Sequence, residues 1–484
     1  MKNLSMAGLQ VVATVLVLTL AGCGGGGGGI AASPDPAPSS AGGVPTVVGT
    51  VTGFGSVVVD GVRIDDRNVA AGVERDDGNV EAAELQLGQH VEVQHDGKLL
   101  ATAIRIRSEV EGTVEKVDVA GASLTVMGQT ITVNTNATLG PVTVFSAPYA
   151  KLADVAVQDL VEVHALLKTD AAGKASMQAT RIQKKTSESS NRVKGIVKNL
   201  TATTFALGNL TINYADAKIR PAANALVSGA TVYVSTLKGE VTSGATVKAT
   251  LVKVKDVKTE SGDQEAGQGG VISKWDATTK TFVLDGRTVD ASNARLAPAT
   301  TSFADLKDGL YVRVIGTYKA DGSVLATVIV LRASEHEVNQ DIELHGTVLN
   351  FKSMQDFTLR GQAVDASEAK IDVESCGAIT TLKDGLQVDV RGSLTATGKV
   401  MAVRVKCEKT EDGNTVVERQ GKVSNVNLTA KTFTLTTVKE TITVQWSSLT
   451  LFVKLDSAAL DGKTLEVEGR MVAGVLQAFK VIQD

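Results

Sequence analysis

The sequence predicts an all-β protein, a tandem array of six small five-stranded β-barrels of the OB-like or SH3-like kind. Three observations lead to this prediction. Glycine is abundant (47 residues) and aromatic residues make up only 4% of the 484, which fits short strands joined by tight turns. No stretch of 12 residues carries a helical apolar period. A glycine that opens a strand recurs six times, at Gly49, Gly112, Gly195, Gly270, Gly346 and Gly421.

Each unit then repeats the same strand pattern. Two apolar residues separated by one position follow the glycine, at Val57/Val59, Leu124/Val126, Phe205/Leu207, Phe282/Leu284, Phe357/Leu359 and Phe433/Leu435. A second alternating segment comes later, at residues 91–93, 161–163, 232–234, 312–314, 388–390 and 465–467. An Ala-x-x-Ile/Val segment closes each unit, beginning at Ala101, Ala179, Ala249, Ala326, Ala402 and Ala478. Alternation with period two is typical of half-buried strands.

The order of these segments predicts the barrel. A three-strand meander, a variable loop and a final hairpin suit a five-stranded barrel, whereas an immunoglobulin-like sandwich needs about seven strands. The predicted repeats are residues 45–108, 109–186, 192–258, 269–333, 341–408 and 416–484. Short charged segments separate them, and we interpret these as solvated linkers between modules in a row. One helical turn is expected near Ser302, ahead of the strand at 312–314.

The first 22 residues have the features of a signal peptide. Lys2 provides the positive charge, and an apolar run from Met6 to Leu20 follows it. Leu20, Ala21, Gly22 and Cys23 resemble the lipobox of bacterial lipoproteins, with residues 20–22 recognised by the signal peptidase and Cys23 lipidated. An ordinary secretory signal is the alternative. Gly24 resembles the residue found in lipoproteins that are sorted to the outer membrane.

Residues 23–44 form the predicted tether between this anchor and the barrels. Six consecutive glycines (Gly24 to Gly29) are followed by a segment rich in proline and serine, which cannot bury enough apolar surface to fold. About 20 residues span roughly 70 Å when fully extended. The folded modules are therefore expected to stand clear of the membrane surface.

Two further cysteines, Cys376 and Cys407, lie within the predicted fifth repeat. Export to an oxidising compartment favours a disulfide between them, and two buried thiols are the alternative.

Two segments identify a family resemblance. Residues 49–63 and residues 111–133 are similar to a bacterial envelope-protein repeat, the domain of unknown function DUF5666. The resemblance implies a lipoprotein of Gram-negative bacteria that carries tandem copies. It implies no activity, because none is accepted for the family.

The sequence offers little for catalysis. Its five histidines form no motif for metal-dependent, nucleophilic or phosphate chemistry, and we predict no catalytic residue, metal or cofactor. His90 and His95 are an odd number of positions apart, so a strand would place them on opposite faces. An acidic segment that includes Asp65, Asp66 and Asp76 is either a weak calcium site or a plain acidic surface.

The charge distribution singles out the third repeat. The whole chain carries a net charge of −4, which excludes a general polyanion binder. Within 192–258, basic residues far outnumber acidic ones. The candidate residues for an anionic ligand are Arg192, Lys194, Lys198, Lys218, Arg220, Lys238, Lys248, Lys253 and Lys255. Solvated lysines are the alternative. Few aromatic residues are available to stack bases, so no nucleic acid is expected.

These observations predict an outer-membrane lipoprotein that acts as a non-enzymatic binding or scaffolding protein of the envelope. Its partners would be membrane lipid, through acylated Cys23, and an envelope protein or an anionic glycan. Recognition of an anionic glycan or lipid by the basic third repeat is the alternative, and an enzyme is the least favoured reading.

Overall fold

The computed structural model describes residues 45–67, 69–74, 80–169, 174–186, 190–255, 264–319, 321–331, 341–372, 382–407, 416–437, 440–447, 450–453 and 455–483. The predicted signal peptide, Leu20, Ala21, Gly22, Cys23 and the tether lie outside these residues, as does Cys376. Residues 41–484 belong to one compact unit of the chain.

The described residues form six modules of β-strands with a few 3₁₀ turns, and the first three modules occupy the N-terminal half. Module 1 contains β1 (Thr46–Phe54), β2 (Val57–Val59), β3 (Val62–Ile64), β4 (Ala71–Glu74), β5 (Val80–Ala82), β6 (His90–His95) and β7 (Ala101–Ile106). Module 2 contains β8 (Val110–Asp118), β9 (Ser123–Val126), β10 (Gln129–Val133), η1 (Ala137–Leu139), β11 (Val144–Phe145), η2 (Leu152–Asp154), β12 (Leu160–Thr169) and β13 (Ala175–Lys184). Module 3 contains β14 (Ser190–Ile196), β15 (Thr204–Leu207), β16 (Leu210–Asn213), β17 (Lys218–Arg220), η3 (Ala223–Ala225), β18 (Thr231–Leu237) and β19 (Thr246–Val254).

The other three modules follow the same plan. Module 4 contains β20 (Gln264–Asp276), β21 (Thr281–Leu284), β22 (Arg287–Asp290), β23 (Arg295–Ala297), η4 (Phe303–Asp305), β24 (Tyr311–Tyr318) and β25 (Val324–Leu331). Module 5 contains β26 (Ile342–Ser353), β27 (Asp356–Leu359), β28 (Gln362–Asp365), β29 (Lys370–Asp372), β30 (Gln387–Leu394) and β31 (Val400–Cys407). Module 6 contains β32 (Val416–Asn427), β33 (Thr432–Thr436), β34 (Thr441–Gln445), β35 (Leu451–Val453), β36 (Thr464–Val472) and β37 (Val475–Gln483).

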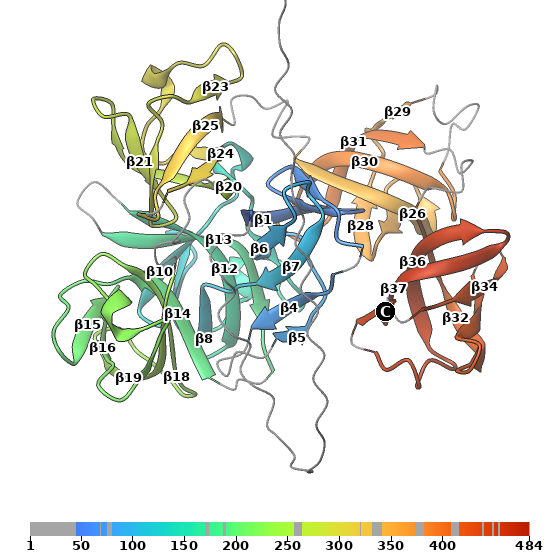
Figure 1. Ribbon diagram of the computed structural model, residues 1–484, viewed down its shortest axis with the longest axis horizontal. Coiled ribbons are helices and arrows are strands. Elements are labelled where there is room, and N and C mark those ends of the chain that lie inside the picture. Colours follow the sequence, from blue (N-terminus) through green and yellow to red (C-terminus); the bar gives the residue numbers. More distant parts are fainter. Residues whose placement is uncertain are drawn as a thin grey trace, which may run out of the picture. The chain divides into compact units, whose positions relative to one another are not determined.

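Module 4 shows how each barrel closes. β20 pairs with β21, β21 with β22, and β22 runs parallel to β25. β25 pairs with β24, which returns to β20 and completes a ring of five strands. The short β23 runs parallel to the second half of β25. In Figure 1 the labelled strands of module 4 (β20, β21, β23, β24 and β25) lie together in one group. The predicted five-stranded barrel is confirmed, and the parallel pairing of its third and last strands is the closure expected of an OB-like barrel.

The repeated apolar residues form the barrel cores. In module 4, Phe282, Leu284, Val312, Val314 and Ile329 are each at most 1% exposed. The other modules bury the matching residues, because strands of period two point one side chain in every pair inward. The predicted helical turn is η4, where Asp305 accepts hydrogen bonds from the backbone N–H and the hydroxyl of Ser302.

The modules are not independent beads in a row. Thr46–Val48 of β1 pairs with residues 266–268 of β20, and the other end of β1 pairs with β26, so module 1 joins modules 4 and 5. β8 pairs with β14, which joins modules 2 and 3. The sequence left the arrangement of the modules open, and in the structure strand edges of one barrel pair with strands of other barrels, some of them distant in sequence.

Cys407, at the end of β31, is disulfide-bonded and buried. Its partner lies outside the described residues, so a bond between Cys407 and Cys376 stays a prediction. Among the described residues no helix is long and apolar enough to cross a membrane.

Candidate functional site

The hairpin between the second and third strands of a barrel carries the main polar feature of the molecule. In four modules both residues of this turn have positive φ, as tight primed hairpins require. We call them the docking turns, and they are Asp60-Gly61, Met127-Gly128, Asp285-Gly286 and Arg360-Gly361. Asp60, Met127 and Asp285 are buried, and Arg360 is half-buried.

The docking turn of module 1 reaches module 4. The Tyr311 hydroxyl donates to Oδ1 of Asp60, and the backbone N–H of Thr50 donates to Oδ2 at 3.2 Å. Asp60 is only 4% exposed. A Cβ atom at Gly269 of β20 would lie 1.9 Å from Oδ2 of Asp60, so this carboxylate fits only because residue 269 is glycine.

The docking turn of module 4 reaches module 3. The Lys194 ammonium lies 2.6 and 2.8 Å from the two carboxylate oxygens of Asp285, and Lys255 Nζ lies 2.7 Å from Oδ2. The Lys194 side chain is 0% exposed and that of Asp285 is 2% exposed. A buried charge of this kind is tolerated only when it is paired and hydrogen-bonded.

The docking turn of module 5 reaches module 6. Arg360 Nε lies 2.8 Å from Oε2 of Glu418, and Nη1 lies 2.5 Å from Oε1 of Glu468. The one Nε–H of Arg360 donates to the carbonyl of His345 in its own module, so the contact with Glu418 is an ion pair without a hydrogen bond. The guanidinium group presents several donors in a fixed plane, so Nη1 donates to Glu468 at the same time.

Modules 2 and 3 meet through an apolar version of the same contact. Met127 is 0% exposed. The Gln129 side chain donates to the carbonyls of Met127 and of Leu207 in module 3, at 2.9 and 3.1 Å. The acidic Asp285 and the basic Arg360 therefore meet groups of opposite charge in the neighbouring module.

Buried polar groups from four modules surround the Lys194–Asp285 pair. We call His90, Glu109, His164, Lys194 and Asp285 the four-module junction. Glu109, which is 0% exposed, lies 2.6 Å from His90 Nδ1 and 3.6 Å from Lys194 Nζ. Its Oε2 accepts the backbone N–H of residue 165, and His164 Nδ1 accepts the backbone N–H of His90.

The charges of the four-module junction compensate one another. Burial alone would raise the pKa of Asp285, but the positive charges of Lys194 and Lys255 hold it well below its usual range. Burial likewise opposes ionisation of Glu109, and the charges of His90 and Lys194 lower the pKa of Glu109 instead. Both carboxyl groups are therefore ionised at neutral pH, and the junction is a set of paired charges.

The predicted basic patch of module 3 is not one surface. Lys194 is fully buried and Lys255 binds Asp285, so neither is available to an external ligand. The physical reason is that the strand ends of module 3 face module 4, whose acidic turn neutralises them. Of the remaining residues, Lys198, Lys218, Lys238 and Lys248 are exposed, and Arg192, Arg220 and Lys253 are half-buried. Lys248 Nζ lies 2.8 Å from Asp216 at the surface.

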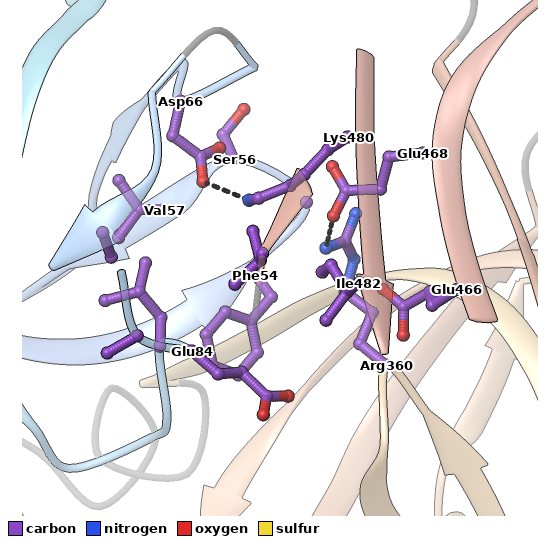
Figure 2. A pocket seen from close by; sticks show the side chains of 15 residues that line it. Phe54, Ser56, Val57, Asp66, Glu84, Arg360, Glu466, Glu468, Lys480 and Ile482 are labelled. Atoms are coloured by element: carbon purple, nitrogen blue, oxygen red, sulfur yellow. Dashed lines mark hydrogen bonds and ion pairs between the residues drawn. The ribbon is translucent and has the colours of Figure 1, made fainter. Parts of the chain in front are cut away.

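A small cavity of about 50 Å³ lies where modules 1, 5 and 6 meet (Figure 2). Its charged lining comes from all three modules and consists of Asp66, Glu84, Arg360, Glu466, Glu468 and Lys480. Figure 2 shows Lys480 directed at Asp66, at 3.3 Å, and Arg360 at Glu468. The cavity has room for a few water molecules and none for an organic ligand.

Carboxylates outnumber cations around this cavity, and the pKa values of the carboxyl groups differ widely from one another. Burial would raise the pKa of Glu468, but Arg360 and Lys480 lower it to about 2. Burial raises the pKa of Glu466 to about 7; the charge of Arg360 opposes this rise, and the neighbouring Glu468 adds to it. Burial also raises the pKa of Glu418 well above its usual value. Within this three-module cavity the pKa of Glu466 therefore lies near neutral pH, and that of Glu468 lies far below it.

Sequence reasoning missed Glu109, Asp285 and Arg360. For Asp285 and Arg360 the signal was present, because each docking turn places its contact residue directly before a glycine between two short apolar strands, but Glu109 lies in no such turn. His90 and His95 are both buried, and His90 is part of the four-module junction. Within the ranges that the structure describes, no group of His, Cys, Asp and Glu is arranged to hold a metal ion.

Comparison with known families fits this architecture. The domain of unknown function DUF5666 matches residues 111–183, 269–330, 345–406 and 420–481, more than half of the chain. The chain belongs to the DUF5666 family. The matched segments are modules 2, 4, 5 and 6, and module 3 has the same strand order outside them, with β15, β16, β19 and β18 in sequence.

Other comparisons add little. No curated protein matches the chain. A solved structure described as "drosophila Unr CSD456" is similar at 14% identity, with 47% of this chain and 99% of that chain covered, at a TM-score of 0.13. A TM-score this low supports no conclusion about fold or function.

Proposed function

We propose that this DUF5666 protein is a non-enzymatic, lipid-anchored scaffold of the bacterial outer membrane, which holds several barrels in one arrangement to bind envelope partners. The observation that supports the proposal is the set of docking turns. Each buries a residue that only the correct neighbour can satisfy, and an unpaired buried charge costs several kcal/mol, about 3–5. Such pairs favour one arrangement of modules over all others.

Such an arrangement provides a composite surface, formed by loops of more than one module. The OB-like barrels keep their cores apolar and place the polar groups discussed above at the contacts between modules. Loops such as those at Val119, Leu237 and Leu428 remain exposed, at 58%, 73% and 54%. A partner that contacts loops of two modules would recognise their spacing as well as their chemistry.

Crosslinking in living cells tests this proposal. Photoreactive residues at Val119, Leu237 and Leu428 should capture the same envelope partner from more than one module. Arg360→Met should lower capture at Leu428, in module 6, and leave capture at Val119 unchanged. Capture that is insensitive to Arg360→Met would contradict a composite surface.

The anchor is tested separately. Cys23→Ser should move the protein from the outer-membrane fraction to the soluble fraction of the envelope, because stable anchoring requires acyl chains on this residue. Retention of the variant in the membrane fraction would contradict lipidation at Cys23.

Recognition of an anionic glycan or lipid by module 3 is the second candidate, and the exposed Lys218 and Lys238 favour it. Binding of the full chain to vesicles that contain lipopolysaccharide should fall as salt rises. A Lys218→Gln and Lys238→Gln double variant should weaken this binding, whereas Lys352→Gln in module 5 should not. Equal binding by both variants would contradict the second candidate.

A further inference from the structure

The contact between modules 3 and 4 brings together the groups of a chemical reaction. Lys194 Nζ lies 2.6 Å from Oδ1 and 2.8 Å from Oδ2 of Asp285. An amine this close to both oxygens also lies close to the carbon between them. A second carboxylate, Glu109, lies 3.6 Å from the same nitrogen, and all three side chains are at most 2% exposed.

Burial favours condensation of such a pair. In water an ammonium and a carboxylate are both strongly hydrated, and they do not react. In a dry, low-dielectric site the neutral amine and carboxylic acid are penalised far less than the two ions. The folded chain also holds the two groups in contact, which replaces a slow encounter by an intramolecular step with a high effective concentration.

We propose that Lys194 and Asp285 form an amide crosslink that joins module 3 covalently to module 4, with Glu109 as the proton carrier. This inference concerns the chain itself and does not depend on which partner the protein binds.

The atoms of the reaction balance without any co-reactant. A proton passes from the Lys194 ammonium to the Asp285 carboxylate, which leaves an amine and a carboxylic acid. The amine attacks Cγ of Asp285 after the carboxyl group has rotated about its Cβ–Cγ bond, and a C–N bond forms. Glu109 accepts a proton from the attacking nitrogen and returns it to the departing hydroxyl of Asp285. The Cγ–O bond breaks, one water leaves, and Glu109 is regenerated.

The surrounding residues have defined parts in this reaction. Lys255 Nζ lies 2.7 Å from Oδ2 of Asp285, where it stabilises the negative charge that develops on this oxygen during attack. His90 lies 2.6 Å from Oε1 of Glu109, and the backbone N–H of residue 165 donates to Oε2, so Glu109 is held in place. These contacts keep the carboxylate of Glu109 beside the reacting nitrogen.

The reaction should be slow, because the ion pair is the resting state. Lys194 and Lys255 hold the pKa of Asp285 well below its usual range, so the neutral pair is a minor species. The crosslink is therefore expected to accumulate after the modules have docked. The other charged docking turns do not place a lysine amine against a carboxylate. Asp60 meets the Tyr311 hydroxyl, and Arg360 meets carboxylates through a guanidinium group.

Peptide mapping of the purified full chain tests the proposal. After denaturation and proteolysis, mass spectrometry should find a branched peptide that joins the segments around Lys194 and Asp285 and is lighter than their sum by one water. Its yield should rise when folded protein is incubated. Unlinked Lys194 and Asp285 peptides as the only products, even after long incubation of folded wild-type chain, would overturn the proposal.

Three variants separate the parts of the mechanism. Lys194→Arg should abolish the branched peptide while keeping a positive charge in the junction. Glu109→Gln should slow its formation at least tenfold, whereas Lys248→Arg, at a surface ion pair of the same module, should leave the rate unchanged. Circular dichroism verifies that each variant is folded. Linkage at the wild-type rate in folded Glu109→Gln would overturn the role of Glu109.

Discussion

The four-module junction and the three-module cavity contain similar charged residues. The positive and negative charges match in the junction, whereas negative charges are in excess in the cavity. In the junction, the two carboxylates of Asp285 and Glu109 meet the two lysines Lys194 and Lys255, so positive charge matches negative charge. In the cavity, one arginine and one lysine face a larger number of carboxylates. The difference teaches that one hairpin geometry can carry either a matched or an unmatched set of buried charges, and the neighbouring residues decide which.

Breaking the balanced junction should have the largest effect. Lys194→Met removes the cation between two buried carboxylates and leaves Asp285 with Lys255 and Glu109 with His90. We expect the free energy of unfolding to fall by about 3–5 kcal/mol, because a buried negative charge then exceeds the positive charge around it. Urea denaturation of the full chain measures this.

The control for this experiment is Lys248→Met, which removes a lysine from an exposed ion pair of the same module and should change stability very little. Equal effects of the two variants would mean that the Lys194–Asp285 contact does not hold modules 3 and 4 together.

Arg360→Met should have the next largest effect, in the unbalanced cavity. Glu418 can become neutral without its partner, whereas Glu468 depends on Arg360 for its low pKa. We therefore expect a smaller loss, of about 2–3 kcal/mol, than a fully ionised junction would suffer. Amide hydrogen exchange should report it as faster exchange in β32 and β36. Unchanged exchange in both strands would contradict docking by Arg360.

Gly269→Ala extends the comparison to a third contact, between modules 1 and 4. The new methyl group would overlap Asp60 and lie 2.6 Å from the Tyr311 hydroxyl. We expect a loss of about 1–3 kcal/mol, typical of overpacking, measured by thermal unfolding. Tyr311→Phe is the matched variant, since it removes only the hydrogen bond, and it should cost less than Gly269→Ala. The reverse order would contradict a close approach at Gly269.

Glu466→Gln should have the smallest effect and the opposite sign. A carboxyl group whose pKa rises from 4.5 to about 7 on folding binds more protons in the folded state. Stability should therefore fall as pH increases from about 4.5 to 7 and then level off. The variant should lose this slope and gain about 1–2 kcal/mol at pH 8. Unfolding at pH 5 and pH 8 measures it, with Glu440→Gln at the surface as the control.

The repeat pattern in the sequence predicted most of the fold. Alternation at Phe282 and Leu284, and again at Val312 and Val314, was enough to predict strands and a barrel, because a buried sheet face requires an apolar residue at every second position. The pairing of β1 with β20 and β26 could not be predicted, since backbone hydrogen bonds between edges leave no mark in side-chain pattern.

The candidate site was harder to predict from the sequence, for a related reason. Lys194 counted as a surface lysine because a single strand gives no sign of the module that will cover it. Its partner Asp285 is 91 residues away, and Glu109 comes from a third module. Charge totals for one repeat therefore describe its surface poorly once modules dock. The turn residue before each glycine was the one local signal.

A double-mutant cycle between Arg360 and Glu468 tests most directly whether docking turns hold the modules together. The free energy of unfolding is measured for wild type, Arg360→Met, Glu468→Met and the double variant. We expect a coupling energy of about 1–3 kcal/mol, because the two groups share one buried contact. Additive effects of the two substitutions would contradict the account.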